Sequence, residues 1–313
     1  MRRPPITAWL LLVTALGCAA AVAPTAACSL RVLAFGDSLT EGFYTVPGGA
    51  TRFHPYSDAL RKLLRAALPA SCHVAVHERG RSGEFVLRSM QGRLDRALAE
   101  AAANGEPYDW VLLLGGTNDI GTGEDGGAVL AALKEMHAAV AAAGSRLVAM
   151  TLPPFNSRPH PPRQQAYGAL NGGLRDAFAA SASAATAGTA TATATAAASA
   201  PSTTASGEPE PEPEATPAAP RGAPAGGPPR AVLVDLEPLF PVTGVADDVK
   251  AATWSDSLHL TPAGYDRLAA ALVAAMLGGG GGAGSGAAAG AAAPRGAVHR
   301  HRVRAGEGAG VAG

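Results

Sequence analysis

The chain has 313 residues, a formal net charge of zero and only 16 % charged residues. A neutral chain lacks the basic excess by which nucleic-acid-binding proteins attract phosphate, so we expect no nucleic acid as partner. Three cysteines exclude a small disulfide-rich scaffold, and no Cys/His cluster has the spacing of a zinc site, so we expect no metal.

Residues 1–27 have the pattern of a secretory signal peptide. Arg2 and Arg3 precede an apolar run from Ala8 to about Ala23, and small residues follow. The run is short for a membrane span and has no basic stop-transfer flank, so no stable span is expected. We expect a secreted or extracytoplasmic protein. The alternative is a protein anchored in the membrane by an uncleaved N-terminal segment.

Apolar runs alternate with amphipathic segments along the rest of the chain. The predicted strands are 30–35, 73–77, 110–114, 146–152 and 231–235. The predicted helices are 56–68, 85–98, 129–143, 163–180 and 262–277. Continuously apolar strands that alternate with helices indicate a parallel sheet of about five strands, covered on both faces. The predicted fold class is therefore a three-layer α/β/α domain.

Two low-complexity stretches do not fit this pattern. Residues 181–229 are rich in Ala, Thr, Pro and Glu and have almost no large apolar side chain to bury, which predicts a disordered insertion. An Ala-rich helix is the alternative, but repeated Pro and alternating Thr argue against it. The Gly/Ala-rich composition of residues 278–313 predicts a flexible tail. Subtracting these segments leaves a single domain within 28–277.

A candidate nucleophile follows the first predicted strand. The run from Leu30 to Phe35 leads directly into Gly36-Asp37-Ser38-Leu39. Parallel α/β sheets place their sites beyond the carboxyl ends of the strands, so Ser38 lies where a nucleophile is expected. Taken alone, without the other motifs, Ser38 fits a plain helix N-cap better than a nucleophile.

A candidate base for this serine lies near the other end of the chain. His259 precedes the last predicted helix, and Asp256 stands three residues before it in the same loop. This spacing allows the carboxylate to reach one imidazole nitrogen and leaves the other for Ser38, since a serine hydroxyl needs a base to take its proton.

Two further loops offer donors for an oxyanion. The loop after the second strand contains Gly83, and the loop after the third contains Asn118. The amides of Ser38 and Gly83 and the side-chain amide of Asn118 are candidates to converge on one oxygen atom. The alternative is a purely structural role, in which Asn118 completes a turn.

Taken together, these segments resemble the four sequence blocks of the SGNH hydrolases, also called the GDSL lipase/esterase family. The blocks are Gly36-Asp37-Ser38-Leu39, Gly83, Gly116-Thr117-Asn118-Asp119 and Asp256-x-x-His259, in family order. The resemblance covers about residues 29–180 and 230–277.

The resemblance implies a flavodoxin-like sheet and cofactor-free ester hydrolysis through an acyl-enzyme. By carry-over, Ser38 is the nucleophile, His259 the base and Asp256 the orienting acid, with Ser38, Gly83 and Asn118 as oxyanion donors. Asp37 is expected to hold its loop. One departure is visible, because Glu78 stands where many relatives have Asn.

Cys28 and Cys72 each stand just before a strand, the first and the second. In a flavodoxin-like sheet these two strands are parallel neighbours, which brings both cysteines to the same edge. We therefore expect a disulfide between them if the protein is exported.

The sequence thus predicts an exported serine ester hydrolase. Its expected partner is an acyl or acetyl ester of a carbohydrate, a lipid or a small alcohol, and acyl transfer to an alcohol stays open. The alternative from another class is a non-catalytic module that binds a carbohydrate or a partner on the same fold.

Overall fold

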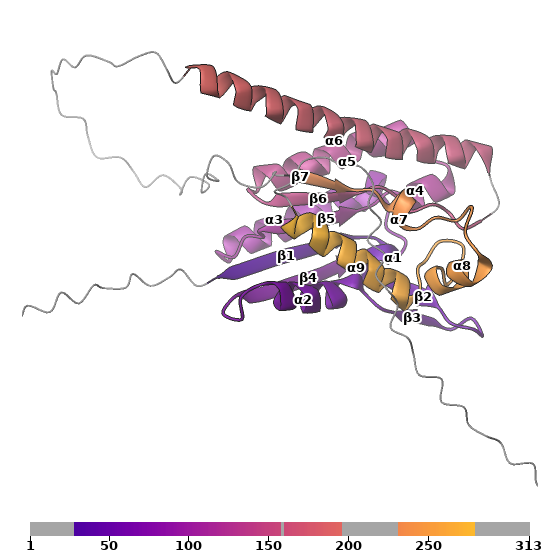
Figure 1. Ribbon diagram of the computed structural model, residues 1–313. Coiled ribbons are helices and arrows are strands. Elements are labelled where there is room, and N and C mark those ends of the chain that lie inside the picture. The colour runs from indigo at the N-terminus through magenta and orange to yellow at the C-terminus, as the bar shows by residue number, and fades with distance from the viewer. Residues whose placement is uncertain (1–27, 158–159, 196–230, 279–313) are drawn as a thin grey trace, which may run out of the picture. The chain divides into compact units, whose positions relative to one another are not determined.

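Five parallel strands form the central sheet of the computed structural model, which describes residues 28–157, 160–195 and 231–278 (Figure 1). They are β1 (Ser29–Gly36), β4 (His73–Gly80), β5 (Trp110–Leu114), β6 (Arg146–Met150) and β7 (Ala231–Val234). Their order is β4-β1-β5-β6-β7, and every neighbouring pair is parallel. The predicted five-stranded parallel sheet is confirmed.

Helices cover both faces of this sheet, which confirms the three-layer α/β/α prediction. On one face α2 (Tyr56–Ala67) packs against α9 (Pro262–Leu277) (Figure 1). On the other face α5 (Gly126–Ala142) packs between α3 (Gln91–Ala103) and α6 (Pro161–Thr195). Strand residues covered on both sides have no water-facing surface, which explains the unbroken apolar runs Val32–Phe35 in β1 and Trp110–Leu114 in β5.

The strand order reverses at β1. The chain leaves β1 toward β4 on one side and later returns to β5 on the other side. In open α/β sheets, such a switch point separates the loops at the carboxyl ends of the strands and leaves room for a site. The loop after β1, which carries Ser38, lies at this point.

The π-helical turn η1 (Val86–Met90) and α3 together take the place of the predicted helix 85–98. Several further short elements were not predicted from the sequence. They are α1 (Ser38–Glu41), the antiparallel hairpin of β2 (Phe43–Thr45) and β3 (Thr51–Phe53), α4 (Thr117–Thr122), α7 (Leu236–Leu239) and α8 (Asp247–Thr253). All of them lie in connections between the elements of the central fold. They are too short to carry a hydrophobic period of their own.

Helix α6 is longer than predicted. It continues from the expected end at Ala180 as far as Thr195 and extends past the other elements (Figure 1). Residues 181–195 therefore differ from the expected disordered insertion, because the helix propensity of alanine outweighs the alternating threonines there. Residues 196–229 of that insertion, the expected signal peptide at 1–27 and the tail after Gly278 lie outside the described residues.

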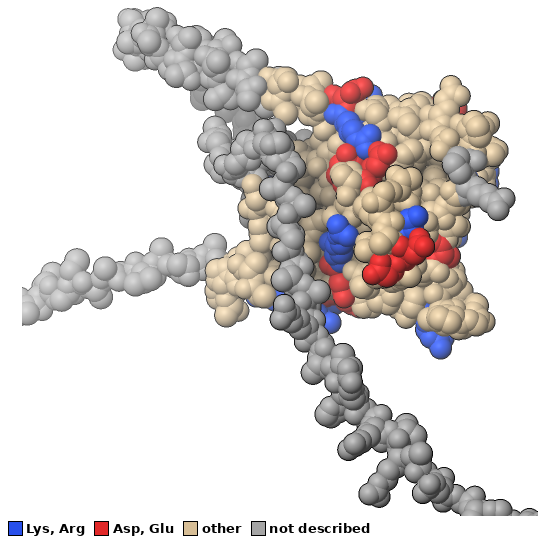
Figure 2. Space-filling model, turned by 45° about the vertical axis from the view of Figure 1, so that its right-hand side comes forward, with Lys and Arg blue, Asp and Glu red and all other residues tan. Residues whose placement is uncertain are grey.

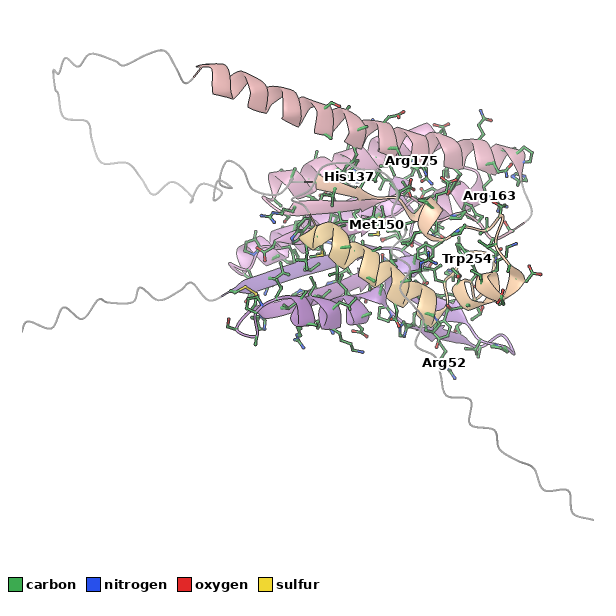
Figure 3. All side chains as sticks on the ribbon, in the orientation of Figure 1. Arg52, His137, Met150, Arg163, Arg175 and Trp254 are labelled. Atoms are coloured by element: carbon green, nitrogen blue, oxygen red, sulfur yellow. A yellow bond between two sulfur atoms is a disulfide. The ribbon has the colours of Figure 1, made fainter. Side chains whose placement is uncertain are left out.

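A network of polar side chains fixes α6 to the sheet. Arg175, which Figure 3 labels on α6, donates to both carboxylate oxygens of Asp235 at 2.8 and 3.0 Å, and also to Glu237. Asn171 accepts from the backbone N–H of Leu152 at 2.9 Å and donates to its carbonyl at 3.0 Å. These bonds hold the segment that leaves β6 at the carboxyl end of the sheet.

The amino end of the sheet carries the disulfide. Cys28 and Cys72 are bonded, with Cα atoms 4.4 Å apart, and Ser29 pairs with His73 in the first register position of β1 and β4. The predicted pairing is confirmed. Among the described residues, no helix is long and apolar enough to cross a membrane.

Candidate active site

Ser38 lies at the first position of α1, directly after β1. Asp37 caps this helix by accepting the backbone N–H of Leu39 at 3.0 Å. Gly36 is required before it, because a Cβ atom there would lie 2.3 Å from the carbonyl oxygen of Leu114 on β5. The turn is therefore tightly held, and the Ser38 side chain lies at the carboxyl edge of the sheet with 4 % of its residue surface exposed.

Ser38, His259 and Asp256 form one hydrogen-bonded row. The Oγ atom of Ser38 lies 3.0 Å from Nε2 of His259. The other ring nitrogen, Nδ1, lies 2.9 Å from Oδ2 of Asp256. With the proton on Nδ1, the imidazole donates to the carboxylate and accepts from the serine hydroxyl, which is the arrangement by which serine hydrolases activate their nucleophile.

The loop that carries Asp256 and His259 is folded back on itself. Oδ1 of Asp256 accepts the backbone N–H groups of Leu258 at 2.8 Å and His259 at 2.7 Å. Burial favours the neutral acid, but these bonds and the His259 side chain outweigh it and hold the pKa of Asp256 below its usual range. The carboxylate therefore stays charged beside the imidazole.

The structure also brings the Gly83 and Asn118 loops together. Asn118 donates through its side-chain amide to the backbone carbonyl of Glu84, at 2.8 Å. Gly83 has a φ of +75°, a conformation that favours glycine. Because the Asn118 amide has two hydrogens, one remains available after the bond to Glu84.

Two acidic residues of the sequence blocks support these loops without joining the row. Asp119 is fully buried and accepts the N–H groups of Val86 at 2.9 Å and Leu87 at 3.1 Å, which anchors η1. Asp37 holds its loop, as expected. Burial raises the pKa of Asp37 to about 7, even though the N–H of Leu39 favours its charged form.

The β2–β3 hairpin is the part of the site that the predicted elements did not include. The ring of Phe43 lies 4.5 Å from the ring of His259, centre to centre. Phe43 is held by a hydrogen bond of 2.7 Å from the Tyr265 hydroxyl to its carbonyl, and Thr45 donates to Asp256 at 3.4 Å. The sequence signal for this hairpin was the aromatic pair Phe43-Tyr44, soon after Ser38.

Two cavities border this region. One of about 420 Å³ lies beside α3 and the end of β4, and its lining includes Phe35, Arg79, Arg93 and Arg96. The other, of about 410 Å³, lies between the hairpin and Trp254, which Figure 3 labels near α8. Neither lining includes Ser38. No cluster of His, Cys, Asp or Glu within the described ranges has the grouping of a metal site.

The visible surface carries mixed charge. In Figure 2, which brings the carboxyl end of the sheet forward, basic and acidic side chains are interspersed over the described part of the protein. Arg88, for example, lies 3.8 Å from Glu124, and both are well exposed. A surface of this kind matches the zero net charge of the chain.

A strand-to-helix turn that presents a serine to a histidine and a carboxylate is a geometry found in serine hydrolases. A family model of the GDSL-like lipase/acylhydrolase family matches residues 34–215. This chain belongs to that family, and it is a carboxylic ester hydrolase. The resemblance seen in the sequence blocks is confirmed.

The solved structures that resemble the chain include three related proteins. A lipolytic G-D-S-L family protein from Veillonella parvula is 17 % identical, with a TM-score of 0.47. Est24, a carbohydrate acetylesterase from Sinorhizobium meliloti, is also 17 % identical, with a TM-score of 0.45. The native aryl esterase of M. smegmatis is 18 % identical, with a TM-score of 0.45. Each alignment covers 78 % of this chain and 96 % of the other. No curated protein gives a significant match.

Proposed function

We propose that the chain is an exported serine esterase in which Ser38 is the nucleophile, His259 the base and Asp256 the orienting acid. One observation carries the proposal, namely the unbroken row of 3.0 and 2.9 Å contacts from Ser38 through His259 to Asp256. The family match ends at residue 215, before His259 and Asp256, so these two roles depend on that geometry.

In the first half of the reaction, Ser38 Oγ attacks the ester carbonyl while Nε2 of His259 takes the hydroxyl proton. Charge develops on the carbonyl oxygen, which accepts hydrogen bonds from the Ser38 and Gly83 amides and from Asn118. The tetrahedral intermediate then collapses, and His259 returns the proton to the departing alcohol. An acyl-Ser38 ester remains.

In the second half, water attacks this acyl-enzyme with His259 again as base, and the carboxylic acid leaves. Asp256 stabilises the imidazolium in both halves. Its low pKa supports this role, because a carboxylate that stays ionised can balance the positive ring.

The substrate is an acyl or acetyl ester of a carbohydrate, a lipid or a small alcohol. Since His259 must protonate the leaving alcohol, that alcohol lies next to this ring. Phe43 packs on His259, and Phe53 packs on Phe43 at 5.9 Å while staying 54 % exposed. These rings support an alcohol part with an apolar face, such as an aryl group or a sugar ring.

Export is proposed from the signal-like sequence and is supported by the Cys28–Cys72 bond, since disulfides persist in oxidising compartments. Mass spectrometry of the culture medium and of the cells tests it. Mature protein that begins near residue 28 in the medium is the expected result, and protein retained with residues 1–27 attached would contradict export.

The test of the mechanism compares the full chain with Ser38→Ala on a chromogenic acetate ester. We expect kcat to fall by about 10⁴-fold or more with an unchanged circular dichroism spectrum. Ser257→Ala is the matched control, because this exposed serine lies in the His259 loop and its expected activity is that of the wild type. Full activity in Ser38→Ala would overturn the mechanism.

A fluorophosphonate label separates the esterase from a non-catalytic binding module. Labelling of the wild type, and its loss in Ser38→Ala, is expected of the esterase. A folded wild type with neither labelling nor turnover would favour the binding module. A panel of acetylated glycans, esters of graded chain length and lysolipids then ranks the substrates by kcat/KM.

A further inference from the structure

One arginine joins three separate segments beneath the candidate oxyanion donors. Arg93, on the first turn of α3, donates to the carbonyl of Gly36 at 2.8 Å, at the end of β1. It also donates to the carbonyl of Arg79 at 2.6 Å, near the end of β4. Its Nε lies 2.8 and 3.0 Å from the two carboxylate oxygens of Glu84. The planar guanidinium suits such a set of acceptors, which the single ammonium of lysine does not match.

Glu84 connects this arginine to the oxyanion donors. It directly follows Gly83, and its backbone carbonyl accepts the side-chain amide of Asn118 at 2.8 Å. Its side chain is only 1 % exposed and meets Arg93 and the Ser89 hydroxyl, while the exposed Arg81 guanidinium lies farther away, at 4.0 Å. Through one residue, therefore, Arg93 is coupled to both the Gly83 loop and the Asn118 loop.

Gly83 itself contributes no packing that would hold the loop. A Cβ atom built there would meet nothing within 4 Å. The loop is instead held from its two sides, by Glu84 on Arg93 and by Ser82, whose N–H donates to Glu41 at 2.8 Å. The direction of the Gly83 amide therefore depends on these hydrogen bonds.

We propose that Arg93 is a positioning residue for the oxyanion hole, acting through Glu84. It fixes the Gly83 loop against the β1 end from which Ser38 projects, and it neutralises a buried carboxylate that would otherwise oppose the negative oxyanion. This inference rests on the proposed esterase mechanism. Displacement of reacting groups by about 1 Å is enough to cost about 10²-fold in rate.

The structure offers a way to replace the lost group. Arg93 stacks on Phe35, with its guanidinium 4.0 Å from the ring centre, and both line the cavity of about 420 Å³ beside α3. In Arg93→Ala, guanidinium ions added at millimolar concentration can therefore enter from this cavity. Urea has a similar shape without charge and serves as the control solute.

The experiment measures kcat per active site, with sites counted by fluorophosphonate titration. For Arg93→Ala we expect kcat per site to fall by about 10–100-fold with a smaller change in KM. Guanidinium should restore part of that loss and urea should not. Arg93→Lys should keep the fold and recover only part of kcat, and Arg96→Ala, on the same helix and cavity, should match the wild type.

A purely structural role gives a different result. Arg93→Ala would then lose titratable sites while each remaining site kept the wild-type kcat, and that outcome would overturn the proposal. Wild-type kcat without guanidinium, or equal rescue by urea, would overturn it as well. Failure of the esterase mechanism is recognised separately, because Ser38→Ala would then retain activity.

Discussion

At each end of β1 an arginine pairs with a glutamate, and the two pairs differ in their contact with water. At the amino end, Arg31 binds Glu106 at 2.9 Å, and the Glu106 side chain is 60 % exposed. At the carboxyl end, Arg93 binds Glu84, whose side chain is 1 % exposed. Both pairs are in direct contact, but only the carboxylate of Glu84 is buried away from water.

Burial changes what each pair does. An exposed pair contributes about 0–1 kcal/mol, because water screens it and competes for its partners. Removing one partner of a buried pair costs about 3–5 kcal/mol, because the other charge is left without compensation. At the amino end, substitution of either charged residue should therefore cost little stability, and the Cys28–Cys72 disulfide is the stronger stabilising contact. At the carboxyl end, stability depends on keeping the buried Glu84 carboxylate paired with Arg93.

The largest expected effect is that of Asp256→Asn at the carboxyl end of the sheet, which should lower activity without lowering stability. Asp256→Asn keeps an oxygen for the N–H groups of Leu258 and His259 but presents an amide to Nδ1, which favours the wrong tautomer. We expect kcat to fall by about 10⁴-fold. Ester hydrolysis and thermal unfolding, measured together, check this, and an equal loss of folded protein would contradict it.

The second prediction concerns removal of the disulfide at the amino end of the sheet. The disulfide closes a loop with a sequence separation of 44 residues. The chain-entropy model assigns such a loop about 4 kcal/mol. Cys28→Ser combined with Cys72→Ser should lower Tm clearly and leave kcat unchanged well below the transition. A reductant added to the double variant is the control and should have no effect. A loss of kcat in the folded variant would mean that the two ends are coupled.

The third prediction uses the pKa of Asp37, which burial raises to about 7. The pKa of an aspartate in an unfolded chain is about 4, so the folded state holds the proton more tightly. The resulting stability is fully present below about pH 4 and is lost as the pH rises through about 7.

Asp37→Asn removes this titration and keeps an oxygen for the N–H of Leu39. The wild type should lose about 2–3 kcal/mol of unfolding free energy between about pH 5 and pH 8 that the variant retains. Urea unfolding at both pH values measures this difference. Asp95→Asn, exposed on α3, is the control, and the same slope in wild type and Asp37→Asn would show the prediction to be wrong.

The smallest expected effect is that of Glu106→Gln, which tests the exposed pair against the buried one. Glu106→Gln should change the free energy of unfolding by less than about 1 kcal/mol and leave kcat unaltered. Glu84→Gln, the same substitution in the buried pair, should cost more. Equal costs, measured by urea unfolding, would mean that burial is not what distinguishes the two pairs.

Much of this arrangement could be predicted, because strong local signals accompany it. The strand Trp110–Leu114 and the helix Pro262–Leu277 have the predicted bounds, since a buried apolar run and a Thr-Pro start define them. Ser38, His259 and Asp256 stand in recognisable blocks at loop positions, and the structure brings them together as predicted.

The rest depends on contacts that the sequence pattern does not report. The strands of the β2–β3 hairpin have three residues each, so no alternation develops, although Phe43 touches His259. The Glu84–Arg93 pair spans the π-helical turn η1, where the helical period changes, so a spacing of nine residues gave no reason to pair them.

The place where α6 ends has a consequence for how this chain can vary in length. Helix α6 begins at the carboxyl end of the sheet and runs back toward the amino end, where β7 begins (Figure 1). Whatever joins Thr195 to Ala231 is therefore attached on the side away from Ser38. Long connections cost little extra closure entropy, so this junction can gain or lose residues over evolution without moving the hydrogen-bonded row of Ser38, His259 and Asp256.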